Sequence, residues 1–145
     1  MEKTSLNLSL IKRKIGEIRQ AIKELRALIS VGKEEFLSDS NMVDASKYKL
    51  IVAIEASIAI CNHIVARLGG RTPESYSDCF IILSEANILS NKLAEKLANM
   101  AKFRNLLVHI YWQVDNEKIY EFINKDLKDL EYFLSELKDY IGEKL

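Results

Sequence analysis

The sequence comprises 145 residues, of which 48% are hydrophobic, 8% aromatic and 29% charged, the composition of an ordinary globular chain. This length supports one hydrophobic core, so we expect a single domain over residues 1–145, and the composition excludes a disordered, collagen-like or disulfide-framework chain. Lys plus Arg and Asp plus Glu number 21 each, and this zero net charge does not by itself indicate nucleic acid or anionic lipid as a partner.

A long amphipathic helix is predicted near the N-terminus and ends at about Gly32. Its apolar residues alternate in steps of three and four, at Leu8, Ile11, Ile15, Ile18, Ile22, Leu25 and Ile29. Such a seam packs inside its own bundle or forms a dimer interface, and the pattern alone leaves both open.

Charge is distributed unevenly along the chain. Residues 1–30 contain seven basic and three acidic side chains, a net charge of +4, whereas residues 113–145 contain five basic and nine acidic ones, a net charge of −4. We expect these two segments to attract each other in an antiparallel bundle. The basic segment faces RNA in one interpretation, and in the other both segments are solvated helix faces.

A second helix is predicted after a looser stretch at residues 33–41. Its middle, residues 50–68, is apolar nearly all round, so we expect it to run through the core until Gly69 and Gly70 end it. Its longest uncharged apolar stretch, residues 56–66, is about half of the ~20 residues that a membrane span requires. Residues 1–4 lead into the first helix without an apolar signal core, so we expect no membrane span and a cytoplasmic location.

Three further helices follow in the sequence. Thr72, Pro73 and Glu74 are typical of a helix start, and a short helix is predicted from there to about Ala86. Ser90 caps a fourth helix that leads into residues 104–112. Asp115 caps a last helix, whose apolar stripe continues to Gly142. With no strand-like alternation and no repeat, we predict an all-α, up-and-down bundle of four main helices plus a short one.

The segment at residues 100–112 contains an unusual group of side chains. Arg104, Asn105, His109, Tyr111 and the single Trp of the chain lie among apolar residues, where polar groups need partners. On an ideal helix Arg104 and His109 differ by about 140° around the axis. We therefore expect the helix to end or distort near residue 108, or the site to be completed by another chain.

An Arg and a His suit chemistry at a phosphate. The guanidinium binds phosphate oxygens, while an imidazole moves a proton near neutral pH. On RNA the 2′-hydroxyl supplies the nucleophile, and this chemistry requires no metal. Asn105 orients the phosphate or the imidazole, and Tyr111 hydrogen-bonds the substrate or stacks on a base. The alternative is structural, with these polar groups satisfied inside the core or at an interface.

The chain resembles the HepT toxin branch of the HEPN superfamily over roughly residues 47–134. The pattern R-x-x-x-x-H-x-Y, from Arg104 to Tyr111 in FRNLLVHIYW, carries the resemblance. Three more segments are similar in the same order: VAIEA through NHI at residues 52–64, PESY at 73–76 and VDNEKIYEFI at 114–123.

This resemblance implies an all-helical homodimer in which two such motifs face each other across a cleft. It also implies a metal-independent endoribonuclease toxin without a cofactor, and a minimal nucleotidyltransferase, MntA, as the antitoxin. Carried over by position, Arg104 and His109 are catalytic and Asn105 supports them. Tyr111 is the residue to which the antitoxin transfers AMP from ATP, which blocks the cleft and places a phosphate beside Arg104.

Some polar residues are interpreted as structural. Relatives often have an acidic residue four positions after the glutamate of the second helix, where this chain has Ala59 after Glu55. We expect Glu55 to be half-buried and hydrogen-bonded, and His63 to be a satisfied core histidine. The two cysteines, at positions 61 and 79, lack metal-ligand spacing and are expected to be buried thiols, and no metal site is predicted.

A second function belongs to a different class. The chain in this case is a non-catalytic helical partner or substrate-binding subunit of a nucleotidyltransferase. This hypothesis predicts a stable complex and no RNA cleavage.

Overall fold

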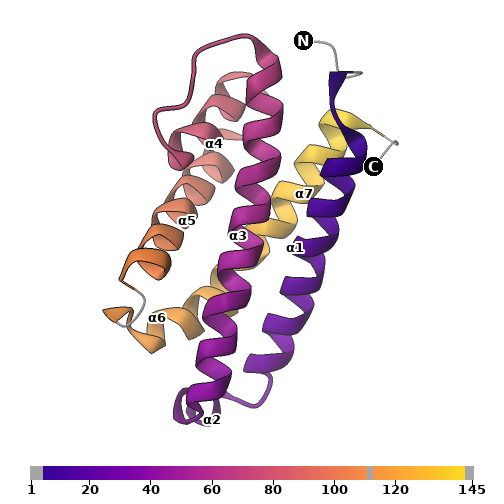
Figure 1. Cartoon of the computed structure of the whole chain (residues 1–145). Helices are drawn as coiled ribbons and strands as arrows, with labels where there is room; N and C mark the ends of the chain where they lie inside the picture. Colours follow the sequence, from indigo (N-terminus) through magenta and orange to yellow (C-terminus); the bar gives the residue numbers. More distant parts are fainter. Residues whose placement is uncertain (1–4, 111–112, 143–145) are drawn as a thin grey trace.

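The computed structural model describes residues 5–110 and 113–142, and within them every regular element is a helix. Figure 1 shows long helices packed side by side along a common direction, which confirms the predicted all-α bundle. In chain order the elements are α1 Leu8–Ile29, α2 Lys33–Ser38, α3 Ser40–Leu68, α4 Tyr76–Glu85, α5 Asn91–His109, α6 Asn116–Glu121, a π-helical turn η3 at Phe122–Asp126, and α7 Lys128–Ile141.

Helix α1 packs inside the bundle rather than presenting its seam to solvent. Asn7 caps it, since the Asn7 side chain accepts a hydrogen bond from the Leu10 amide at 3.0 Å. The buried residues of its seam are Ile11, Ile15, Ile18, Ile22 and Leu25. Because α1 contacts α3 most extensively, the seam belongs to the core of this chain.

Helices α1 and α7 run antiparallel (Figure 1), as the opposite charges of the two chain ends predict. Arg26 donates two hydrogen bonds to the Glu131 carboxylate, at 3.0 and 2.5 Å. This contact holds the pKa of Glu131 below its usual range. The expected attraction is therefore present as a bidentate ion pair.

Helix α3 lies at the centre of the bundle, as predicted from its apolar circumference (Figure 1). Over the described residues it is the one helix long and apolar enough to cross a membrane by length and composition, which differs from the shorter stretch expected from the sequence. However, 56% of its most apolar window is buried against neighbouring helices. The core helix of a soluble protein has the same property, so this composition is weak support for a span.

Three predicted boundaries are wrong for local reasons. Residues 33–38 form α2 instead of a loose stretch, because Phe36 is fully buried and anchors that turn. Helix α4 begins at Tyr76 and not near Pro73, because Ser75 provides the cap by accepting a hydrogen bond from the Asp78 amide at 3.1 Å. The last helix is divided by the π-helical turn, where the Leu127 amide donates to the Phe122 carbonyl at 3.1 Å.

Candidate functional site

Arg104 lies near the end of α5, where it is fixed by several partners. Its side chain is only 15% exposed. Nε and Nη2 donate to Oε1 of Glu55 on α3, at 3.2 and 2.5 Å, and Nη1 donates to Oδ1 of Asn105 at 3.0 Å. The guanidinium also lies over the Tyr76 ring of α4, 5.4 Å from its centroid. Three helices thus hold one guanidinium in place.

Arg104 lines an open hollow at the surface. It lies between α3, the segment before α4, and the end of α5, and its lining residues are Asn62, Pro73, Glu74, Ser75, Tyr76, Arg104, Asn105 and His109. Helix α5 ends at His109, which confirms the expected helix end near residue 108. Arg104 and His109 lie about 140° apart around the axis of α5, with Asn105 between them, and all three line the same hollow.

The segment before α4 is held by its own ion pairs. Arg71 donates two hydrogen bonds to Asp78, at 2.6 and 2.8 Å, and a third to Glu85 at 3.2 Å. Asp78 also accepts a hydrogen bond from the Glu74 amide at 3.0 Å. The Arg71 guanidinium and this amide keep the pKa of Asp78 below its usual range. The wall of the hollow opposite α5 is thus tied to α4.

Tyr111, the predicted modification site, lies outside the described residues. The same holds for Trp112, which follows it. The structure consequently brings together Arg104, Asn105 and His109, and the position of Tyr111 relative to them stays a prediction.

Glu55 is half-buried and hydrogen-bonded, as expected from the sequence. Its side chain is 48% accessible, and it accepts hydrogen bonds from Arg104. Ala59 and Asn62 follow Glu55 by four and seven residues, so the three lie on one face of α3. Asn62 lines the hollow but was not identified from the sequence, and this spacing from Glu55 is the signal that could have found it.

His63 does not belong to the hollow, and it is not a core residue. It is partly exposed, and its Nε2 accepts a hydrogen bond from the Asn7 amide at 2.9 Å. Partial burial, together with the nearby Arg67 cation, lowers the pKa of His63. His63 anchors the start of α1. The prediction that it is hydrogen-bonded is confirmed, but the prediction that it lies in the core is wrong.

Both cysteines are buried thiols, as predicted. The Cys79 thiol donates to Oδ1 of Asn62 at 3.1 Å. Burial, and then a hydrogen bond with Cys79, raises the pKa of Cys61 well above its usual value. Over residues 5–110 and 113–142, no group of three His, Cys, Asp or Glu side chains is arranged to hold a metal ion.

Comparison with known proteins finds one family and several close structural relatives. A family model described as Ribonuclease HepT-like matches residues 18–137. A protein of Shewanella oneidensis described as mRNA nuclease HepT is 29% identical over 129 residues, which cover 89% of this chain and 96% of that protein. A tRNA nuclease HepT of Aphanizomenon flos-aquae is 22% identical over 138 residues, or 95% of this chain and 94% of that one.

The fold is also that of a solved toxin structure. In a complex of tri-AMPylated Shewanella oneidensis HEPN toxin with MNT antitoxin, the matched chain has a TM-score of 0.83 and 28% sequence identity. The match covers 90% of this chain and 97% of that chain. The enzyme class predicted from the sequence is thus the one that the family description and both nuclease relatives carry.

Proposed function

Because this chain belongs to the Ribonuclease HepT-like family, we propose that it is a metal-independent endoribonuclease with Arg104 and His109 as its catalytic residues. The observation that carries the proposal is that both side chains line one open hollow, in which Glu55 and Tyr76 fix the guanidinium. Preorganised cations of this kind stabilise charge that develops in a transition state.

The proposed reaction needs only these groups and the RNA. His109 takes the proton of a 2′-hydroxyl, and the resulting oxygen attacks the neighbouring phosphorus while Arg104 binds the phosphate oxygens. The bond to the 5′ oxygen breaks, that oxygen takes up a proton from water, and His109 releases its own proton to the solvent. The products are a 2′,3′-cyclic phosphate and a 5′-hydroxyl. Asn105, which accepts a hydrogen bond from the guanidinium, supports its orientation.

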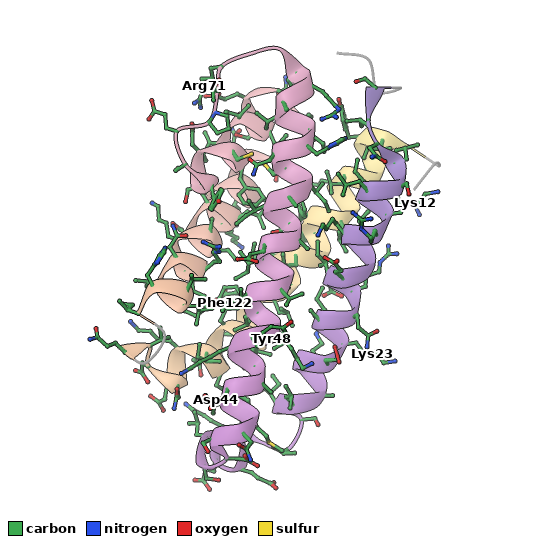
Figure 2. All side chains as sticks on the ribbon, in the orientation of Figure 1. Lys12, Lys23, Asp44, Tyr48, Arg71 and Phe122 are labelled. Atoms are coloured by element: carbon green, nitrogen blue, oxygen red, sulfur yellow. The ribbon has the colours of Figure 1, made fainter. Side chains whose placement is uncertain are left out.

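A basic stripe on α1 supports RNA binding despite the zero net charge of the chain. The exposed residues Lys12, Arg19, Lys23 and Arg26 lie within about 60° of one another around the helix axis. Figure 2 shows Lys12 and Lys23 on the side of α1 that faces away from α3. Lys138 of α7 lines the same groove as Arg19 and Lys23. Glu131 lies there too and pairs with Arg26, so the phosphate contacts are assigned to Lys12, Arg19, Lys23 and Lys138.

We propose a homodimer and a nucleotidyltransferase antitoxin as its protein partners. The matched Shewanella toxin is described in complex with MNT antitoxin and as tri-AMPylated, which supports AMP transfer to Tyr111 here. Three exposed large side chains, Tyr76, Leu106 and Val108, lie at or near the hollow and suit contact with another chain. We also propose a cytoplasmic location and a single domain over residues 1–145. Light scattering tests the homodimer, and a monomer in that measurement would contradict it.

The central test is RNA cleavage in excess EDTA by wild-type protein and His109→Ala, once intact mass shows that Tyr111 is unmodified. We expect the wild type to leave 2′,3′-cyclic ends and the variant to lose roughly 10²–10⁴-fold in rate, the usual contribution of a general base. His63→Ala is the matched control. This histidine lies outside the hollow, so we expect its variant to keep full activity.

Each other result has a defined meaning. Cleavage that EDTA abolishes contradicts metal independence, and equal cleavage by both proteins indicates a contaminant. No cleavage by either protein, together with a stable nucleotidyltransferase complex, favours the non-catalytic partner.

The basic stripe has its own test in the salt dependence of RNA binding by the full chain. Lys23→Ala removes one phosphate contact, so we expect the slope of log K against log salt to become shallower by about 0.7, with kcat unchanged. Lys92→Ala, on the exposed start of α5, is the control. An unchanged slope in the Lys23 variant contradicts the assignment of this surface to RNA.

A further inference from the structure

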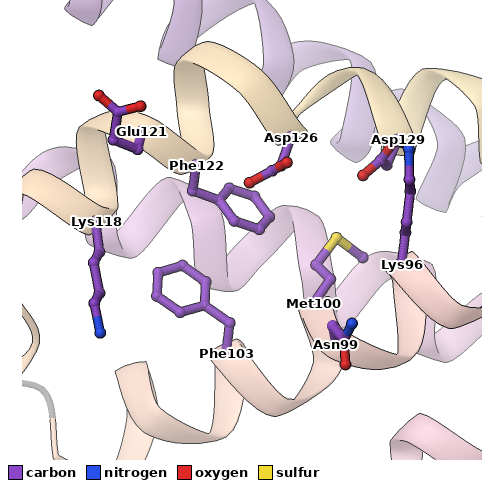
Figure 3. Close-up of a pocket in the computed structure, with 9 residues that line it drawn as sticks. All are labelled: Lys96, Asn99, Met100, Phe103, Lys118, Glu121, Phe122, Asp126 and Asp129. Carbon is purple, nitrogen blue, oxygen red and sulfur yellow. Dashed lines mark ion pairs between the residues drawn. The ribbon is translucent and has the colours of Figure 1, made fainter.

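A second cavity lies on the other side of α5, between α5 and the segment from α6 to the start of α7. Figure 3 shows the Phe103 and Phe122 rings together on one side of it and Asp129 on the other, with Met100 between them. Its volume is about 420 Å³, within the usual range of small-molecule sites. It shares no lining residue with the hollow at Arg104.

The π-helical turn forms one wall of this cavity. Three buried residues follow one another at intervals of four: Ile119, Ile123 and Leu127. On a regular α-helix these two intervals would place Leu127 about 80° around the helix axis from Ile119. The wider winding of a π turn absorbs this rotation and keeps the three residues on the core side. As a result Asp126 lines the cavity, and so does Phe122, which also packs against the edge of the core.

Asp129 is a buried carboxylate without a hydrogen-bond donor among the described residues. Its side chain is 8% exposed, and its Oδ1 accepts no hydrogen bond. The ammonium of Lys96 lies 3.9 Å away, too far for a hydrogen bond, and that side chain is 46% exposed. Burial raises the pKa of Asp129; the Lys96 charge lowers it in part, and the neighbouring Asp126 raises it again. A buried carboxylate oxygen that has a distant ion pair but accepts no hydrogen bond is costly and needs an explanation.

We infer that this cavity is a binding site for a planar organic cation, an amidinium or guanidinium on an aromatic or apolar stem. The N–H groups of such a cation satisfy Oδ1 of Asp129, and its stem packs on Met100 and Phe122. Among the charged lining residues, Glu121, Asp126 and Asp129 outnumber Lys96 and Lys118, and this balance favours a cation over an anion. A neutral apolar ligand without N–H groups would leave Oδ1 of Asp129 without a hydrogen bond. The site does not depend on the proposed ribonuclease activity, because its ligand occupies a different face of α5.

The stacked rings strengthen the choice of a flat ligand. Phe103 and Phe122 lie 5.0 Å apart between centroids with an interplanar angle of 21°, so together they offer an ordered aromatic wall. Planar amidinium and guanidinium groups also present two parallel N–H bonds to one carboxylate. The cavity thus combines a flat apolar surface with an acceptor at its far side.

The test is titration of benzamidine into the isotopically labelled full chain, followed by backbone NMR. We expect saturable shifts confined to amides around Met100 and Phe122, and a dissociation constant at least tenfold larger for Asp129→Asn. Asp139→Asn is the matched control, because it makes the same change on an exposed position of the same helix and should bind like the wild type.

Neutral benzamide and anionic benzoate separate charge from shape. Benzamide binding as tightly as benzamidine would overturn the inference, as would the absence of saturable shifts or unchanged affinity in Asp129→Asn. If Asp129→Asn fails to fold, the exposed Asp126→Asn replaces it, with an expected two- to threefold loss of benzamidine affinity. Unchanged affinity in that variant counts against the inference in the same way.

Discussion

The partly buried charges on the two sides of α5 differ in how fully they are hydrogen-bonded. Facing α3 and α4, the guanidinium of Arg104 has a carboxylate, an amide oxygen and an aromatic ring as partners. Facing α6 and α7, the carboxylate of Asp129 accepts no hydrogen bond at Oδ1 from the described residues. The first arrangement holds in place the guanidinium that we propose binds the RNA phosphate. The second leaves a buried oxygen without a hydrogen bond, which costs stability that a bound ligand with N–H groups would restore.

The largest expected effect comes from Arg104→Lys, which keeps the charge and removes the planar fork. A lysine lacks the planar fork that donates twice to Glu55 and once to Asn105 and that stacks flat on Tyr76, so we expect kcat on RNA to fall at least a hundredfold with the fold intact. Steady-state cleavage checks this, with Lys92→Ala as the control. If the variant keeps more than a tenth of the activity, charge alone is sufficient at this position.

Glu55→Gln tests whether the carboxylate positions Arg104. Glutamine keeps an acceptor but loses the charge-assisted hydrogen bonds, so we expect about a tenfold lower kcat. KM should not rise, because a negative charge is removed from beside the RNA phosphate. A purely structural role of Glu55 would instead lower stability and leave the ratio of kcat to KM unchanged, which cleavage kinetics and thermal unfolding distinguish.

Asp129→Asn tests the opposite arrangement and should stabilise the free protein. Removing a buried charge that accepts no hydrogen bond at Oδ1 is expected to raise the free energy of unfolding by about 1 kcal/mol at neutral pH. Because the pKa of Asp129 is raised in the folded state, the folded chain binds the proton more tightly, and the penalty declines as the pH is lowered towards the unfolded value of about 3.9.

Urea unfolding at neutral pH and near pH ~4 measures this difference. The advantage of the variant should shrink at the lower pH. Asp139→Asn should stay within about 0.5 kcal/mol of the wild type at both. A destabilised Asp129→Asn at neutral pH would mean that the carboxylate has a favourable partner in solution.

Long periodic patterns predicted most of the fold. The seam of α1 and the apolar circumference of α3 extend over many residues, so both helices and their burial followed from the sequence. Helix α2 was missed because six residues are too few for a periodic pattern and the burial of Phe36 is a tertiary effect. The π turn was missed because the spacing of the apolar residues around it is also typical of an ordinary α-helix.

The candidate site was predicted only in part. One short motif contains Arg104, Asn105 and His109, and its resemblance to the HepT family identified them as candidates. Glu55 lies 49 positions before Arg104, and only the packing of α3 against α5 makes it the partner of that guanidinium. Asp129 stands in an acidic segment that resembles a solvated helix face, and its burial depends on α5 and the π turn.

The contact between Asn7 and His63 gives the start of α1 a chemical sensitivity of its own. The lone pair of His63 that accepts the Asn7 amide is also the site that a proton would occupy. The pKa of His63 is lowered in the fold, so this contact is retained at neutral pH and lost as acid protonates the imidazole. Acidification therefore loosens the junction between the N-terminal turn and the central helix α3.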